Sequence, residues 1–171
     1  MILNIKSKNT LYLATLLIVV SMASCYSFKG ISIPPEANTY YVADFLLKAN
    51  NAPPDVNQKF AEALRAKVRN ESRLLYSETD PDITFEGSVS SYSVTGNAPQ
   101  EGNTVALNKL TITVTIQYTN NTVEDDEWNQ TFSFFKDFDA TIDLNSVEDE
   151  FIDEIYEQLV ENIFNKAFTD W

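Results

Sequence analysis

The chain lacks histidine altogether, has a single cysteine, and carries only 12 basic residues against 25 acidic ones. Without histidine it has neither the commonest general base nor the commonest metal-binding side chain. Without a second cysteine it cannot form an internal disulfide. The net charge of −13 opposes binding to nucleic acid and leaves no polybasic patch for a membrane surface. A hydrophobic content of 44% nevertheless predicts a folded domain instead of a disordered acidic chain.

The single cysteine, Cys25, follows a short apolar segment near the start of the chain. Two lysines come first, then ten uncharged and mostly apolar residues, 11–20, and then the small residues Ala23 and Ser24. Ten residues rise only about 15 Å as a helix, roughly half of a bilayer core, so this segment is too short to span a membrane. The layout is typical of a secretory signal peptide, and a cysteine directly after it is typical of bacterial lipoproteins.

We predict that residues 1–24 are a lipoprotein signal peptide and that residues 25–38 are a lipidated tether. Cleavage would follow Ser24, the Cys25 thiol would take a diacylglycerol, and the new amino terminus would be acylated, with palmitate a typical chain. Several acyl chains, at about 0.8 kcal/mol per buried CH₂, hold a protein firmly on a membrane. The alternative is an ordinary signal peptide followed by a chance cysteine. Because the signal contains two lysines and no acid, the 147 residues that follow it carry a net charge of −15.

Residues 39–171 are predicted to form a single domain, because apolar periodicity continues through them. Strands are indicated by β-branched and aromatic runs, and helices by apolar residues that recur every three or four positions. The predicted elements are a strand over 39–45, a helix from Pro54 to about Leu74, a strand over 83–94 with a bulge near Gly87, strands over 109–118 and 128–138, and a long helix capped by Ser146.

The strand over 109–118 has the clearest pattern in the chain. Its even-numbered residues are apolar and its odd-numbered residues between them are polar, which predicts one buried and one wet face. The apolar side consists of Leu110, Ile112, Val114, Ile116 and Tyr118, and the polar side of Thr111, Thr113, Thr115 and Gln117.

The element order is therefore β-α-β-β-β-α. The first strand, the helix and the second strand can form a βαβ unit, and the last two strands can form a hairpin. Each helix has one apolar face, so both helices can cover the same side of a sheet. We predict an α+β fold, a two-layer sandwich in which a four-stranded, mostly antiparallel sheet carries two helices on one face.

Some charged residues are candidate sites, although each set also has a structural explanation. Arg65, Arg69 and Arg73 form one row of the first helix, which is either an anion-binding row or a solvated face balanced by nearby glutamates. The acidic turn 124–127 lacks the spacing and the glycine of a calcium-binding EF-hand loop. Asp137 and Asp139 are the nearest approach to the paired carboxylates of a hydrolase. We predict no catalytic residue, no metal site, no cofactor and no enzymatic activity.

Several short segments of the chain together carry a resemblance to a known family. They are the predicted lipidated Cys25 with residues 26–30, the run 108–114, the segments 85–92 and 134–139, and the terminal Asp170-Trp171. With these segments the chain resembles the LptE family of lipopolysaccharide-assembly lipoproteins. The resemblance spans nearly all of the chain after the signal. The chain departs from the family at Tyr26, where glycine usually follows the cysteine.

The resemblance implies a lipid-anchored protein of the outer membrane, with its domain facing the periplasm or the lumen of a β-barrel. Its partner would be the large barrel of the LptD family, which it would plug and help to assemble, and it would support lipopolysaccharide transport to the cell surface. Some family members touch lipopolysaccharide through basic residues near the loop edge of the sheet. The corresponding candidates are Lys109, beside the loop 95–107, and Lys136, near the end of the last strand.

A second hypothesis is a lipid-anchored module, periplasmic or exposed at the surface, that binds a sugar or a peptide on its sheet. It requires exposed aromatic side chains on one face, and Tyr92, Tyr118 and Trp128 are the candidates. Packing in the hydrophobic core explains the same three residues equally well.

Overall fold

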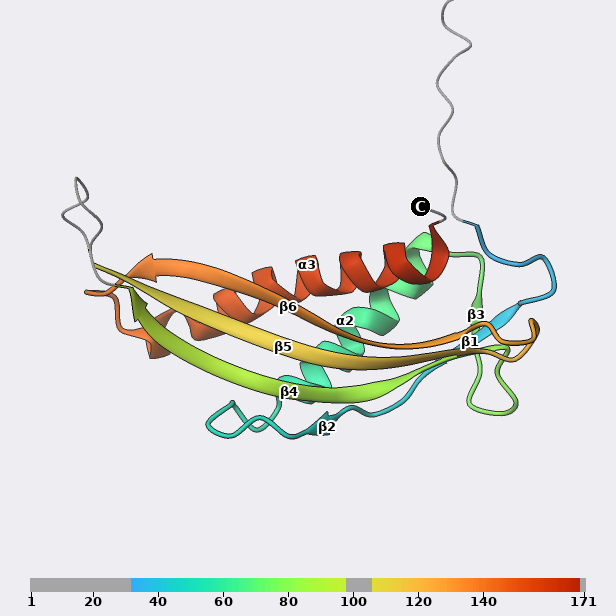
Figure 1. Ribbon diagram of the computed structural model, residues 1–171, viewed down its shortest axis with the longest axis horizontal. Coiled ribbons are helices and arrows are strands. Elements are labelled where there is room, and N and C mark those ends of the chain that lie inside the picture. Colours follow the sequence, from blue (N-terminus) through green and yellow to red (C-terminus); the bar gives the residue numbers. More distant parts are fainter. Residues whose placement is uncertain (1–31, 98–105, 170–171) are drawn as a thin grey trace, which may run out of the picture. The chain divides into compact units, whose positions relative to one another are not determined.

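The computed structural model describes residues 32–97 and 106–169, and Cys25 lies outside these ranges. The described residues form six strands, two helices and a short 3₁₀ turn (Figure 1). In chain order these are β1 (Thr39–Val42), β2 (Leu46–Leu47), α2 (Val56–Glu71), β3 (Leu75–Tyr76), β4 (Ile83–Asn97), β5 (Leu107–Asn120), β6 (Glu127–Asp139), η1 (Leu144–Ser146) and α3 (Glu148–Phe168). Among the described residues, no helix is both long enough and apolar enough to cross a membrane.

The strands form one mixed sheet in the order β3-β1-β4-β5-β6, and β2 also pairs with β4. The three long strands β4, β5 and β6 are antiparallel, whereas β1 pairs in parallel with both β3 and β4. Both helices lie on one face of this sheet (Figure 1). The predicted α+β, two-layer architecture is therefore confirmed.

The predicted number of four strands was wrong, because β2 and β3 are two further strands of two residues each. A two-residue strand cannot display an alternating pattern, so the sequence gives no sign of it. The predicted strand 39–45 in fact ends at Val42 and pairing resumes at Leu46. In between, the side chain of Phe45 is buried against Phe60 of α2, with ring centroids 4.9 Å apart.

The core lies between the sheet and the two helices. All five apolar residues of the alternating pattern in β5 are at most 1% exposed, as predicted. They face the buried rows of α2 and α3, which match the predicted apolar faces. The α2 row is Val56, Phe60, Ala61, Leu64 and Val68, and the α3 rows include Ile152, Ile155, Leu159, Ile163 and Phe164.

A bulge was predicted near Gly87 in the strand over 83–94, which is β4. The irregularity of β4 lies instead at Ser90, where the register with β5 shifts between Val89 and Ser91. The extra residue lets both Val89 and Tyr92 face the core, which explains the broken parity of the sequence. Gly87 serves a different purpose. A Cβ atom on Gly87 would lie 2.0 Å from the carbonyl oxygen of Thr115 in β5, so only glycine allows the two strands to come this close.

Ser146 does not cap α3, contrary to the prediction. Its hydroxyl donates to the carbonyl oxygen of Asp143, and the helix begins at Glu148 after the 3₁₀ turn. Three acidic residues in the first turn of α3, residues 148–150, still place negative charge at the positive end of the helix. The prediction failed because a serine hydroxyl can also stabilise a preceding turn, and the sequence does not distinguish the two uses.

Asp82, just before β4, fastens the start of β1 to the sheet. Its carboxylate accepts hydrogen bonds from the backbone N–H groups of Asn38 and Thr39, at 2.8 and 2.9 Å, and from the Thr39 hydroxyl. The Thr39 hydroxyl oxygen in turn accepts from the Asp82 N–H at 3.0 Å. Because these bonds favour the ionised form, the backbone donor of Asn38 and the two donors of Thr39 lower the pKa of Asp82.

An Asp82→Asn variant is expected to melt several degrees below the unchanged protein at pH 7. The pKa of Asp82 is lower in the folded state than in the unfolded state. The contribution of the Asp82 carboxylate to the free energy of unfolding is therefore complete above its unfolded pKa, 3.8. This contribution is lost as the pH falls through its folded pKa. Thermal unfolding followed by circular dichroism should show the difference shrinking as the pH falls below the unfolded value of 3.8. Glu124→Gln, on an exposed turn, is the matched control. If the melting temperatures of Asp82→Asn and the unchanged protein differed by the same amount at every pH, the ionised carboxylate would not be the stabilising group.

Candidate functional site

The face of the sheet opposite the helices, here called the open face, is dominated by hydroxyl and amide side chains. Alternation along each strand and the registers between strands bring these side chains to one side. The residues are Thr84, Ser88, Ser91 and Ser93 on β4, Thr111, Thr113, Thr115 and Gln117 on β5, and Asn129, Thr131 and Ser133 on β6. Charged side chains stand mainly toward the ends of this face, in a chain that is otherwise strongly acidic.

The side chains of the open face bond to one another across the strands. Thr113 and Ser133 hydroxyls lie 3.1 Å apart, and the amide of Asn129 donates to the Gln117 oxygen at 2.9 Å. Thr115 and Thr131 form a similar pair at 3.2 Å. Such cross-strand pairs stabilise the sheet and hold a polar surface in a fixed arrangement. The open face can therefore meet another polar surface with little reorganisation.

Lys109 and Lys136, the two candidate lipopolysaccharide contacts, lie on opposite faces of the sheet. Lys109 is opposite Asp137 in the β5–β6 register, whereas Lys136 is opposite the buried Leu110. On the open face, the Lys109 ammonium is 3.9 Å from an Asp137 oxygen and 3.9 Å from the centre of the Phe135 ring. The structure thus brings the two lysines near the same end of the sheet but does not join them in one site.

On the helix side, Lys136 bonds to Glu154 of α3 and lies over the Phe151 ring. Each candidate lysine therefore already has an acidic and an aromatic neighbour. An anionic ligand would have to compete with the carboxylate for either ammonium group.

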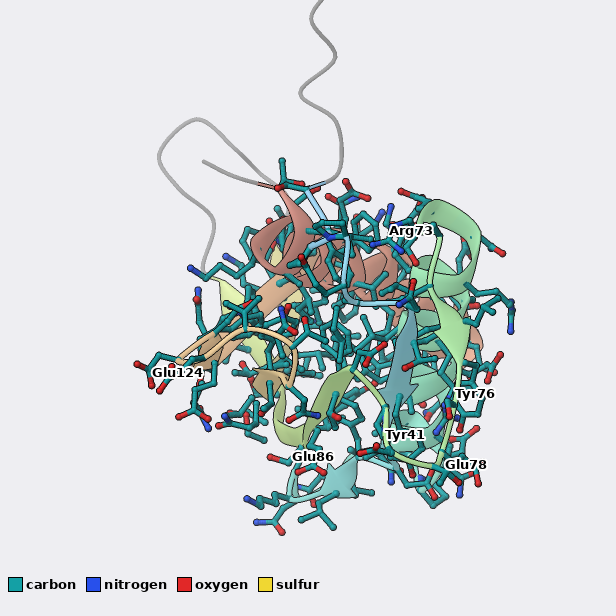
Figure 2. The ribbon with its side chains drawn as sticks, turned by 90° about the vertical axis from the view of Figure 1, so that its right-hand side faces the viewer. Tyr41, Arg73, Tyr76, Glu78, Glu86 and Glu124 are labelled. Atoms are coloured by element: carbon teal, nitrogen blue, oxygen red, sulfur yellow. The ribbon has the colours of Figure 1, made fainter. Side chains whose placement is uncertain are left out.

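The predicted row of arginines fastens backbone segments instead of forming an anion site, and Arg73 lies just beyond α2, which ends at Glu71 and not near Leu74 as predicted. Arg65 donates twice to the carbonyl oxygen of Val42 and once to the Asp44 carboxylate. Arg73 donates to the carbonyl oxygen of Pro34 at 2.7 Å. Figure 2 shows Arg73 at the surface on the α3 side of the domain. The first and last members of the row therefore secure the segments that lead into β1 and β2.

The other carboxylates that the sequence singles out are used in turns. Asp139 accepts hydrogen bonds from the hydroxyl and the N–H of Thr141, which lower the pKa of Asp139. Asp126 accepts from the side-chain amide of the buried Asn120 and so closes the β5–β6 turn. Within residues 32–97 and 106–169, no group of three or more acidic side chains is placed to hold a metal ion.

Of the three aromatic residues of the ligand-module hypothesis, Tyr92 and Tyr118 belong to the core, and Trp128 is partly buried against it. Tyr118 and Trp128 stack on the helix side, with ring centroids 5.2 Å apart. Tyr92 is buried and its hydroxyl donates to Glu148 at the start of α3. This burial and the neighbouring carboxylate raise the pKa of Tyr92. None of the three therefore forms an exposed platform on the open face.

Two features of the structure had no counterpart in the sequence analysis. Lys67 of α2 is 14% exposed and bonds to both Glu71 and Glu161, which ties α2 to α3 and lowers the pKa of Glu161. The second is a hollow of about 420 Å³ on the open face, here called the β2 hollow. Its lining includes Leu46, Lys48, Glu86, Ser88, Gln117 and Asn129. Both depend on contacts between distant segments, so no local pattern could have indicated them.

Comparison with known proteins gives one family and a set of similar folds. The family model described as lipopolysaccharide-assembly, LptE, matches residues 28–167. A homologue of the neuraminyllactose-binding hemagglutinin from Helicobacter pylori is 11% identical with a TM-score of 0.54. The match covers 82% of this chain and 88% of that one. The protein CT253 from Chlamydia trachomatis is 6% identical with a TM-score of 0.52. That match covers 77% of this chain and 98% of the other. No curated protein gives a significant sequence match, and these two structural matches concern the fold alone.

Proposed function

We propose, for a chain that belongs to the LptE family of lipopolysaccharide-assembly proteins, that it plugs the large β-barrel of the lipopolysaccharide translocon. In this role it helps the barrel of the LptD family to assemble and supports lipopolysaccharide transport to the cell surface. It acts as a structural subunit without catalysing a reaction.

The open face is the observation that carries this proposal. The interior of a large outer-membrane barrel is polar and filled with water, unlike its lipid-facing exterior. A plug therefore needs a polar surface that is already satisfied by its own hydrogen bonds, because unpaired polar groups are costly to bury. The hydroxyl pairs between β5 and β6 provide such a surface. The helices on the other face keep the hydrophobic core away from the lumen.

The membrane anchor in this proposal is the lipid on Cys25, which holds the domain at the outer membrane. A Cys25→Ala variant should lose the lipid and move from the membrane fraction to the soluble periplasmic fraction. Because several acyl chains contribute to anchoring, we expect membrane-bound protein to fall by at least tenfold. Cell fractionation and the intact mass of the purified protein measure both effects. A Cys25→Ala protein that stays in the membrane would rule out the lipid as the anchor.

Lys109 and Lys136 remain the candidate contacts for lipopolysaccharide in this proposal. Lys109 is the better placed for a ligand that passes over the open face, because its ammonium lies on that side of the sheet. The acidic neighbours Asp137 and Glu154 limit each lysine to a local contact with one anionic group. A broad electrostatic attraction is excluded by the net charge.

Co-extraction of the full, lipidated protein tests the proposal. The tagged protein is solubilised from its native outer membrane in mild detergent, and mass spectrometry quantifies the proteins that accompany it. We expect one large β-barrel protein in nearly equal amount. Recovery of the lipoprotein alone, under conditions that keep other outer-membrane complexes intact, would overturn the proposal that the protein plugs the barrel.

A further inference from the structure

The β2 hollow forms where the chain leaves the sheet between β1 and β2. The Ala43 N–H still donates to the Phe85 carbonyl oxygen at 2.9 Å, and pairing with β4 resumes when Leu46 comes opposite Ser88. Residues 43–45 therefore stand against only residues 86–87 of β4. The hollow has a volume of about 420 Å³, which lies within the range of small-molecule sites. Glu86, one of its lining residues, lies on the side of the domain away from α3 (Figure 2).

Ser88 of β4 lines this hollow. The residue as a whole is only 4% exposed, and its side chain makes no hydrogen bond within the described part of the chain. A side-chain hydroxyl with no protein partner can donate to and accept from a bound molecule. The neighbour of Ser88 in the opposite strand, Thr115, is by contrast paired with Thr131. The Ser88 hydroxyl is therefore available to a group that enters the hollow.

The charges around the hollow are of both signs. Asp44 and Glu86 contribute carboxylates and Lys48 an ammonium group. A small anion would be repelled by the two carboxylates, and a small cation would meet the lysine. Asp44 is also already engaged, by Arg65 at 3.0 Å. The lining therefore favours a neutral ligand.

The remaining lining groups can both donate and accept hydrogen bonds. Gln117 and Asn129 are held by their mutual hydrogen bond, so each presents its other amide groups in a fixed direction. Leu46, which is 61% exposed, adds an apolar patch at the edge. A sugar ring has the matching chemistry, since each of its hydroxyl groups donates and accepts while its C–H face is apolar.

We infer that the β2 hollow is a binding site for a neutral saccharide ring. Glu86 accepts from ring hydroxyls, Ser88 bonds to the hydroxyl that reaches the floor, and Leu46 contacts the C–H face. The sugar is either a free saccharide or a neutral ring within a glycolipid. This inference does not depend on the plug, because it concerns the lipoprotein without its barrel.

Saturation-transfer NMR on the full, detergent-solubilised lipoprotein tests the site. The probes are N-acetylglucosamine, galactose and methyl glucoside as free saccharides, and delipidated lipopolysaccharide as the glycolipid source. We expect binding in the millimolar range, as is usual for a shallow polar site. Glu86→Gln should weaken it about tenfold and Ser88→Ala about fivefold, because each removes one hydrogen bond to the sugar.

Ser93→Ala is the matched control, since it removes a hydroxyl from the same strand and the same face outside the hollow. It should leave the affinity unchanged within about twofold. No transfer from any probe at tens of millimolar would overturn the inference. So would binding that both hollow variants leave intact. Neither result would alter the barrel co-extraction, so a failure of this site and a failure of the plug can be told apart.

Discussion

Replacing Gly87 with alanine is expected to lower the free energy of unfolding by roughly 3 kcal/mol or more. The added Cβ would lie 2.0 Å from the Thr115 carbonyl oxygen and 3.0 Å from the Phe45 ring. The first of these contacts is with backbone, which cannot move aside without separating β4 from β5. The substitution therefore disrupts the pairing of the two longest strands next to the β2 hollow. Urea unfolding followed by tryptophan fluorescence measures the loss.

Gly96→Ala is the control for this experiment because Gly96 lies in the same strand. Within the described part of the chain, its added Cβ would meet only the Asn108 side chain, at 3.5 Å, which is an ordinary contact. We expect a change of less than about 1 kcal/mol. Equal effects at the two positions would show that close approach at Gly87 does not limit stability.

A bulky residue in the middle of the open face is expected to reduce recovery of the barrel by at least tenfold. Thr113→Trp is suited to this test, because tryptophan is well accepted on a strand and Thr113 points away from the core. The free protein should fold normally, with only its bond to Ser133 lost. In the complex the indole would clash with the lumen wall, and a clash of about 1.4 kcal/mol already lowers affinity tenfold. The co-extraction assay gives the ratio of barrel to lipoprotein.

Glu157→Trp on the exposed side of α3 is the matched variant for the other face. If the open face meets the wall, this variant retains the barrel. Loss of the barrel with Glu157→Trp and retention with Thr113→Trp would assign the wall contact to the helices. Thermal unfolding of both purified proteins confirms that the comparison concerns binding and not folding.

The parts of the fold that could be predicted are those in which a single element repeats a pattern many times. β5 alternates over more than ten residues, and its burial follows that alternation throughout. The two helices repeat apolar residues over 16 and 21 positions, so their faces were clear as well. β2 and β3 depend on where distant segments come together, and no local pattern indicates them.

The open face could be predicted for the same reason, since Thr111, Thr113 and Thr115 alternate with buried residues. The face on which Lys109 lies could be predicted as well, because Lys109 is a polar position of that alternation. The register of β6 against β5, which places Lys136 on the helix side, could be fixed only by the structure. The partner Glu154 comes from a helix far along the chain, so its ion pair was invisible in the sequence.

The long strands extend farther than the helix that covers them. β4 has 15 residues and would reach about 50 Å, whereas the 21 residues of α3 reach only about 32 Å. Val94, near the far end of β4, is accordingly 44% exposed although it lies beside the buried Leu110. Strand ends held only by their neighbours open locally at lower free energy than a strand backed by a helix. We therefore expect the part of the sheet that the helices cover to be rigid and the strand ends beyond α3 to open more easily. These ends can then adjust to a partner while the core stays closed.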